Sequence, residues 1–152
     1  MSEYLQTVFQ KFELRVRKGY YYTEDGLWTS VEGPKVRVGV TDYLQRTRGD
    51  AAFVDLVKPG STVQKQTGIG TLETAKTTVS LLSPISGTVE EVNGMLSEKP
   101  ELVNSDPYGE GWLITLTPRS LEDDLKMLMC ADDYFQLMLK KLETEHKKPE
   151  SR

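Results

Sequence analysis

Short segments that alternate polar and apolar residues, separated by turn residues, occupy the middle of the chain. The segment Lys35–Val40 places valines at alternate positions, which is typical of a half-buried β-strand. Thr41 or Asp42 can then cap a helix and Gly49 can end it, so we expect a short helix through about Thr47.

The pattern continues after residue 51 as short strands punctuated by glycine and proline turns. Lys76 stands between two of these strands, at the position of a hairpin tip. A loose internal echo, in which two glycine-led turns are each followed by a valine, adds to a pattern that predicts a mainly β fold. The expected strands of this part lie at 52–57, at 62–63, on either side of Lys76, at 88–92 and at 111–118.

The two ends of the chain are less regular. In residues 1–21 the apolar spacing fits either a helix or a strand, and we favour a strand at 11–17. Residues 143–152 are rich in charged side chains and predict a flexible tail.

Between the last strand and the tail, the apolar spacing becomes helical over residues 119–142. Ser120 and Asp123 resemble a capping box, and a second helix is expected to begin at Asp132 or Asp133. Both helices should pack on the β-rich body. The side chains expected to face it are Leu121, Leu125, Leu128, Met129, Tyr134, Phe135, Met138, Leu139 and Leu142.

Composition limits the kinds of function that the chain can have. Its 152 residues suffice for one domain, and the net charge of −4 favours neither nucleic acid nor an anionic membrane. No apolar run approaches the ~20 residues of a membrane span, and no secretion signal is visible. Cys130 is the one cysteine, which agrees with a reducing compartment, so we expect a cytoplasmic protein.

The same composition argues against catalysis by the chain itself. The one histidine, His146, lies in the charged tail, far from Cys130 and from the β-rich centre. No His/Cys metal cluster and no Ser/His or Cys/His nucleophile pair can be assembled from this inventory. We therefore expect a protein that is not an enzyme and whose reactive group is added to it.

Lys76 is the candidate position for that group, because a hairpin tip projects the amine away from the sheet. Several blocks around it resemble the glycine cleavage system H protein family, in the family's order, over residues 22 to about 116. The blocks are Val38-Gly39-Val40-Thr41-Asp42-Tyr43, Gly49-Asp50, Phe53-Val54, Glu73-Thr74-Ala75-Lys76, Ser83-Pro84-Ile85-Ser86-Gly87 and Glu101-Leu102-Val103-Asn104-Ser105-Asp106-Pro107-Tyr108-Gly109-Glu110-Gly111-Trp112.

The resemblance implies a fold, a cofactor and partners. The fold would be a lipoyl/biotinyl-type β-sandwich (a barrel-sandwich hybrid) over 22–118, with short flanking helices, an N-terminal extension at 1–21 and a C-terminal helical segment. Lys76 would carry lipoate in amide linkage, and Glu73 would help the lipoate-attaching enzyme to recognise it. The carrier would shuttle an aminomethyl group between glycine decarboxylase, the aminomethyltransferase and dihydrolipoamide dehydrogenase.

One segment departs from the family and leaves the pathway open. Where members commonly have Asp-His-Glu-Trp, near the groove that receives the loaded arm, this chain has Asp25-Gly26-Leu27-Trp28. Gly26 and Leu27 offer no side-chain hydrogen bond, so we expect weaker shielding of the aminomethyl adduct. Two alternatives stay open: the lipoate-binding carrier of heterodisulfide-reductase-like sulfur oxidation, and a lipoyl-transfer relay protein. Biotin carriage is disfavoured, because Lys76 is not flanked by methionines.

Overall fold

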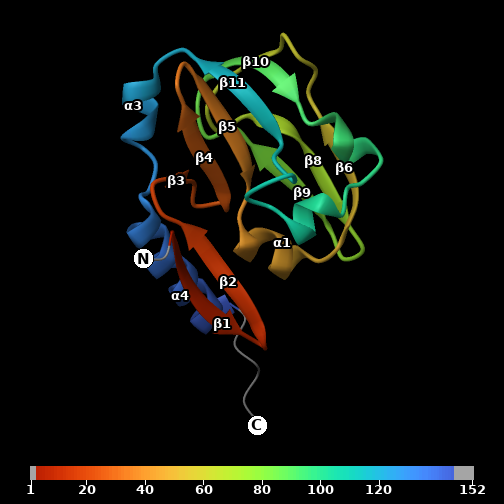
Figure 1. Ribbon diagram of the computed structural model, residues 1–152, viewed down its shortest axis with the longest axis vertical. Helices are drawn as coiled ribbons and strands as arrows, with labels where there is room; N and C mark the ends of the chain where they lie inside the picture. Colours follow the sequence, from red (N-terminus) through yellow and green to blue (C-terminus); the bar gives the residue numbers. More distant parts are fainter. Residues whose placement is uncertain (1–2, 146–152) are drawn as a thin grey trace.

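The computed structural model describes residues 3–145 and is built mainly of strands with short helices around them (Figure 1). The strands are β1 (Tyr4–Phe9), β2 (Phe12–Arg17), β3 (Tyr21–Tyr22), β4 (Leu27–Glu32), β5 (Lys35–Val40), β6 (Ala51–Leu56), β7 (Thr62–Val63), β8 (Gly68–Thr74), β9 (Thr78–Leu82), β10 (Gly87–Val92) and β11 (Ile114–Pro118). The helices are α1 (Asp42–Arg48), a 3-10 turn at Gly94–Ser97, α2 (Leu102–Ser105), α3 (Leu121–Leu125) and α4 (Ala131–Glu145).

Two sheets form the body. One has six strands in the order β3-β4-β5-β11-β10-β7, and the other has three in the order β6-β8-β9. The apolar core of the body collects buried residues from both sheets, among them Val36, Leu72 and Leu116. The sheets do not close into a barrel, so the expected mainly β, sandwich-like fold with a C-terminal helix is confirmed.

A second, more aromatic cluster joins the two ends of the described chain. It contains Trp28 and Tyr22 from the body, Leu14 from β2, and Tyr134 and Met138 from α4. The rings of Tyr22 and Tyr134 stack with their centroids 4.8 Å apart. Aromatic pairs of this kind contribute beyond the area that they bury. The hairpin β1–β2 and helix α4 therefore share one small core, beside the sandwich (Figure 1).

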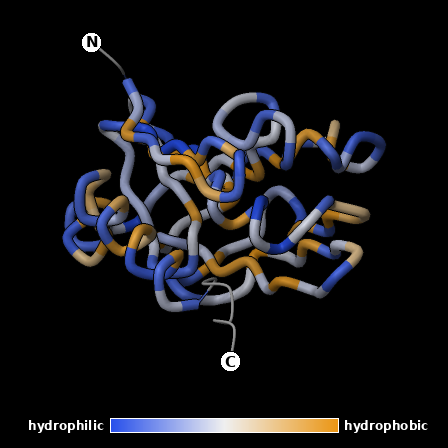
Figure 2. Tube along the Cα trace, turned by 90° about the horizontal axis from the view of Figure 1, so that it is seen from below, coloured by the Kyte–Doolittle hydropathy of each residue, from blue (hydrophilic) through white to orange (hydrophobic). Residues whose placement is uncertain are grey.

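Most elements of the central region lie where the polar–apolar pattern predicted them. The strand at Lys35–Val40 is confirmed, and α1 begins after Thr41, whose hydroxyl accepts a hydrogen bond from the Leu44 N–H at 3.1 Å. Figure 2 shows that hydrophilic and hydrophobic residues follow one another in short stretches along the trace. The last strand, β11, begins at Ile114 rather than at residue 111, because the Gly111 N–H bonds the Asp106 carbonyl in a turn.

The two ends of the chain differ more from the structure that the sequence predicted. The strand favoured at 11–17 is present as β2, but it pairs in a hairpin with β1, which the sequence left unassigned. The capping-box interpretation of Ser120 and Asp123 is wrong, since the Ser120 side chain makes no cap hydrogen bond to α3. Helix α4 begins at Ala131 and runs through Glu145, and the rest of the expected tail lies outside the described residues.

Buried Met138 provides a test of how much α4 contributes to stability. It is fully buried in the second cluster, whereas Met127 is 72% exposed. We expect Met138→Ala to lower the free energy of unfolding by about 2–5 kcal/mol, because it leaves a cavity. Met127→Ala, the matched control, should change it by less than about 0.5 kcal/mol. Urea unfolding measures both, and equal effects would show that α4 does not stabilise the body.

Candidate functional site

Lys76 lies at the tip of the β8–β9 hairpin, as its position between two strands predicted. Both Ala75 and Lys76 are exposed, so the lysine amine is open to solvent. The Thr74 N–H donates to the Thr77 carbonyl at 2.8 Å and closes a tight turn around the lysine. The backbone of the candidate site is therefore ordered although its side chain is exposed.

The Thr74 hydroxyl organises this turn. Its oxygen accepts hydrogen bonds from the backbone N–H groups of Lys76 and Thr77, each at 3.1 Å. The same hydroxyl donates to the Arg48 carbonyl at 2.7 Å. Since Arg48 is the last residue of α1, the Thr74 side chain ties the hairpin tip to the end of that helix. No pattern in the sequence indicates this role, because threonine is common in strands for other reasons.

The end of α1 also supports the lysine side chain. Gly49 has a φ of +102°, and a Cβ built there would lie 3.5 Å from Cγ and Cδ of Lys76. The stem of Lys76 therefore runs over Gly49. Asn104 fixes this corner, because its amide donates to the Gly49 carbonyl at 3.1 Å and its oxygen accepts from the Ala51 N–H at 2.8 Å.

Asn104 also begins the segment 104–112, which contains the aromatic residues Tyr108 and Trp112. Tyr108 is 8% exposed, and its hydroxyl donates to the Arg15 carbonyl at 2.8 Å. Trp112 is partly buried and lies under the guanidinium of Arg37. The aromatic residues of this segment therefore pack within the structure.

Two hollows lie near the lysine turn. One is a groove of about 320 Å³ that includes Thr77 and Thr78 of the hairpin, with Asp25 and Glu145 supplying carboxylates and Arg48 and Lys141 supplying cations. We call it the acidic-basic groove.

The second hollow, of about 380 Å³, includes Lys76 itself and lies between the β1–β2 turn and α1. We call it the hairpin hollow.

Tyr43 lines the acidic-basic groove with an uncharged side chain. Burial raises the pKa of the Tyr43 hydroxyl, and the negative charge of Glu145 raises it further, while Arg48 lowers it. The phenol is therefore protonated at neutral pH. The groove thus presents a neutral phenol next to charged groups of both signs.

Gly26 and Leu27, which replace the family's His-Glu, do not line the groove as the sequence led us to expect. Leu27 is 1% exposed and belongs to the apolar core, so its side chain does not line the groove. Gly26 has a φ of +98°, and a Cβ there would lie 3.2 Å from the Leu44 Cβ. Only Asp25 of this segment reaches the groove. The expected loss of shielding cannot be assigned to side chains at these two positions.

Glu73, expected to take part in recognition, is exposed on β8. It pairs across the strands with Thr78 on one side and Phe53 on the other. Within residues 3–145 its carboxylate forms no ion pair with Lys76. The Glu73 side chain is therefore available to another molecule.

Other chemistry receives no support from the described part of the chain. Residues 3–145 contain no group of three or more His, Cys, Asp or Glu side chains that could hold a metal ion. Cys130 is exposed and forms no disulfide. Among the helices described here, none is long and apolar enough to cross a bilayer.

A β-rich body that presents one exposed lysine on an ordered hairpin has the geometry of a carrier protein. The family model for the glycine cleavage H-protein matches residues 20–141. A probable glycine cleavage system H protein of Pyrococcus horikoshii is 42% identical over 127 residues, which are 83% of this chain and 94% of that protein. The corresponding protein of Bacteroides fragilis is 45% identical over 113 residues, 74% of this chain and 89% of that protein.

The structural comparison agrees. The crystal structure of a glycine cleavage system H protein from Mycobacterium marinum superposes with a TM-score of 0.73 at 31% identity, covering 80% of this chain and 97% of that one. The chain belongs to the glycine cleavage H-protein family. Members of this family are carriers, so the protein is a carrier and not a catalyst.

The role of the Thr74 hydroxyl in ordering the Lys76 turn can be tested by substitution. Thr74→Val keeps the shape of the side chain but removes its hydrogen bonds to the Lys76 and Thr77 N–H groups and to the Arg48 carbonyl. We expect hydrogen exchange at the Lys76 and Thr77 amides to accelerate about tenfold, since each lost bond contributes about 1 kcal/mol.

Thr71→Val is the control for this test. Thr71 lies on the same strand, and its hydroxyl makes no hydrogen bond within residues 3–145. Its substitution should leave the exchange of both turn amides unchanged. Unchanged exchange in Thr74→Val as well would contradict the role assigned to the hydroxyl.

Proposed function

We propose that Lys76 carries lipoate in amide linkage and that the protein is the lipoyl carrier of a glycine cleavage system. It moves an aminomethyl group between glycine decarboxylase, the aminomethyltransferase and dihydrolipoamide dehydrogenase. The observation that carries the proposal is the exposed Lys76 on a turn that Thr74 ties to α1. The relatives named above are glycine cleavage H proteins, which favours this pathway over sulfur oxidation or lipoyl transfer.

The residues around Lys76 fit a long acyl chain. Lys76 is exposed and lines a hollow of about 380 Å³, and a groove of about 320 Å³ begins at the next residue, Thr77. Lipoate supplies an exchangeable disulfide when bound, whereas the chain has one cysteine and so no cysteine pair of its own. The body contributes a fixed origin for the tether, and a short tether keeps its end at an effective concentration on the order of millimolar.

The acidic-basic groove suits an arm that carries a cationic amine. Asp25 and Glu145 place carboxylates in the groove, and a charge-assisted hydrogen bond to either would hold the amine. These carboxylates lie outside the Gly26-Leu27 pair that departs from the family. Shielding of the loaded arm therefore has a source in this chain, from the Asp25 turn and from the end of α4.

The partners follow from the same proposal. They are the three enzymes of the system named above and an enzyme that attaches lipoate to Lys76. A cytoplasmic location, expected from the single cysteine, belongs to this proposal too. The division into residues 1–21, 22–118, 119–142 and 143–152 stays a prediction.

Lipoylation at Lys76 can be tested by intact mass. Protein co-produced with a lipoate-attaching enzyme should gain the mass of one lipoyl group, and Lys76→Arg should gain none. Lys58→Arg, a control at another exposed lysine, should be modified normally. Both variants should unfold at the midpoint of the parent protein. A modified Lys76→Arg protein would refute the proposed site.

We propose that the lipoate-attaching enzyme recognises the Glu73 side chain. Its exposed carboxylate stands beside Phe53, which is 68% exposed, so a charged group and an apolar ring face solvent together. We expect Glu73→Gln to slow lipoyl attachment about tenfold, the loss associated with one charge-assisted hydrogen bond. Asp55→Asn, at an exposed carboxylate on neighbouring β6, is the control and should be modified at the parent rate. Equal rates for all three proteins, followed by mass spectrometry, would remove Glu73 from the recognition surface.

A further inference from the structure

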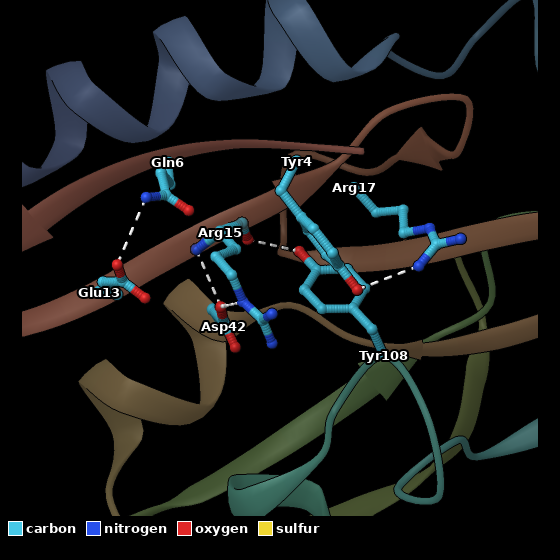
Figure 3. A network of polar contacts seen from close by, with 7 residues as sticks. All are labelled: Tyr4, Gln6, Glu13, Arg15, Arg17, Asp42 and Tyr108. Atoms are coloured by element: carbon cyan, nitrogen blue, oxygen red, sulfur yellow. Dashed lines mark hydrogen bonds and ion pairs between the residues drawn. The ribbon is translucent and has the colours of Figure 1, made fainter. Parts of the chain in front are cut away.

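The β1–β2 hairpin lies before the part of the chain that matches the family model, which begins at residue 20. One edge of this hairpin is fixed to the body (Figure 3). The Arg15 N–H donates to the buried carboxylate of Asp42 at 2.8 Å, and the Arg15 carbonyl accepts a hydrogen bond from the Tyr108 hydroxyl at 2.8 Å. The backbone of β2 therefore finds its outer partners on the side of α1.

The opposite edge of the hairpin, along β1, is open. Directly opposed residues of an antiparallel pair exchange both of their backbone hydrogen bonds or neither. Gln6 lies opposite Arg15, whose N–H bonds Asp42, so the N–H and C=O of Gln6 point away from β2. The backbone groups of Val8, two residues further along, point to the same side. Within residues 3–145, the backbone groups of Gln6 and Val8 have no hydrogen-bond partner.

Strand β1 also lacks the features by which sheet edges avoid pairing with another chain. Such edges are usually very short, or they carry charged residues, proline or a bulge. Among the other edges of the described chain, β3 and β7 have two residues each, and β6 contains Asp55 and a register shift. Strand β9 runs beside the charged side chains of the acidic-basic groove. By contrast, β1 has six residues in an unbroken register, none of them charged or proline, and Val8 is 67% exposed.

We propose that two copies of the protein pair through β1, as antiparallel strands related by a two-fold axis at Thr7. In this register Gln6 lies opposite Val8 of the second copy, so their open N–H and C=O groups bond each other on both sides of the axis. The two hairpins become one four-stranded sheet, in the order β2-β1-β1-β2. The inference goes beyond the proposed function and does not depend on the group that Lys76 carries.

The occupant of the edge is a second copy of this chain because the side chains around the axis complement themselves. The register opposes Leu5 to Phe9 and Thr7 to Thr7, an apolar pair and a pair of hydroxyls that favour cross-strand pairing. It also brings the exposed Glu3 of each copy opposite the exposed Lys11 of the other. A parallel arrangement would oppose Glu3 to Glu3. Charge therefore selects the antiparallel pairing.

The pairing leaves room for helix α4 of both copies. This helix covers the inner face of its own hairpin, where Leu5 and Leu14 belong to one cluster with Tyr134 and Met138. The two-fold axis places both helices on the same face of the shared sheet. Since neighbouring strands lie about 4.8 Å apart, the helices lie about 10 Å apart, a distance at which helices pack.

The pairing also keeps the two lysines apart. The β1–β2 turn lies beside Lys76, since Gln10 and Lys76 line the hairpin hollow together. Antiparallel pairing at Thr7 places the two turns at opposite ends of the shared sheet, roughly 20 Å apart along the strands. Each copy therefore keeps its lysine outside the interface, and the dimer presents two of them.

The first test uses Gln6 and Val8, whose exposed side chains lie on the outer face of the hairpin and oppose each other in the dimer. A double lysine variant (Gln6→Lys with Val8→Lys) opposes like charges twice, and so does a double glutamate variant (Gln6→Glu with Val8→Glu). A contact between short strands is small, so sedimentation equilibrium from micromolar to millimolar protein should show a reversible dimer of the parent. Either variant should weaken it about tenfold, because like charges directly opposite are destabilising.

An equimolar mixture of the two variants is the decisive sample. It opposes lysine to glutamate at both pairs, so it should regain at least the dimer fraction of the parent. Val31→Lys with Met127→Lys is the matched control, since it adds the same charge as the double lysine variant at exposed positions outside the hairpin. The control should dimerise as the parent does.

Hydrogen exchange identifies the interface in the parent protein and needs no variant. The Gln6 and Val8 amides have no acceptor within residues 3–145 of a single copy, so they should exchange rapidly in dilute solution. Their exchange should slow severalfold at the concentrations where the dimer forms. The Leu5 and Thr7 amides, which point to β2, should exchange slowly at both concentrations.

Each other outcome overturns the pairing. A protein that stays monomeric up to millimolar concentration leaves the open edge to a strand of another protein. A dimer in which the Gln6 and Val8 amides stay unprotected has its interface elsewhere. Failure of the mixed lysine and glutamate variants to associate contradicts the register at Thr7.

Discussion

The contact between Asp42 and the backbone of Arg15 determines how the parts of this protein fit together. Asp42 is 6% exposed, and burial raises the pKa of its carboxyl, while the N–H and guanidinium of Arg15 oppose that effect. A buried carboxylate is costly unless it is hydrogen-bonded, so the strand that supplies the partner must stay in place. Asp42 also lies in the first turn of α1, where negative charge is favourable. One side chain thus fixes the hairpin to the helix that supports the lysine.

Helix α1 makes this contact relevant to function. Its first residue holds the hairpin, and its last residue, Arg48, accepts the hydrogen bond from Thr74 in the lysine turn. Gly49 follows, with the Lys76 stem across it. A helix of 7 residues therefore connects the N-terminal hairpin, the lysine and both neighbouring hollows. The exposed Lys76 side chain stands on a support made from segments distant in sequence.

The sequence predicted the features that depend on local pattern. Alternating valines predicted β5, and a capping threonine followed by a terminating glycine predicted α1. These signals lie within a few residues of the element that they define. Lys76 became the candidate site because turn residues and a family block surround it, and its place at a hairpin tip is confirmed. The aromatic cluster could not be predicted, because Tyr22 and Tyr134 are distant in sequence and only the folded chain brings their rings into contact. The burial of Leu27 in the apolar core was not predicted for the same reason. An apolar residue in place of the family's polar one does not reveal which way the side chain points.

The aromatic cluster also has a consequence for how the chain folds during synthesis. Thr41 and Tyr134, whose hydroxyls lie 3.1 Å apart, are separated by 93 residues, and Leu14 precedes both. Contacts of such long range form late, because much of the chain must be ordered before they close. The inner face of the hairpin thus leaves the ribosome long before α4 can cover it. Between those two moments the nascent chain exposes Leu14, Val16 and Trp28, a surface that chaperones bind and that aggregation exploits.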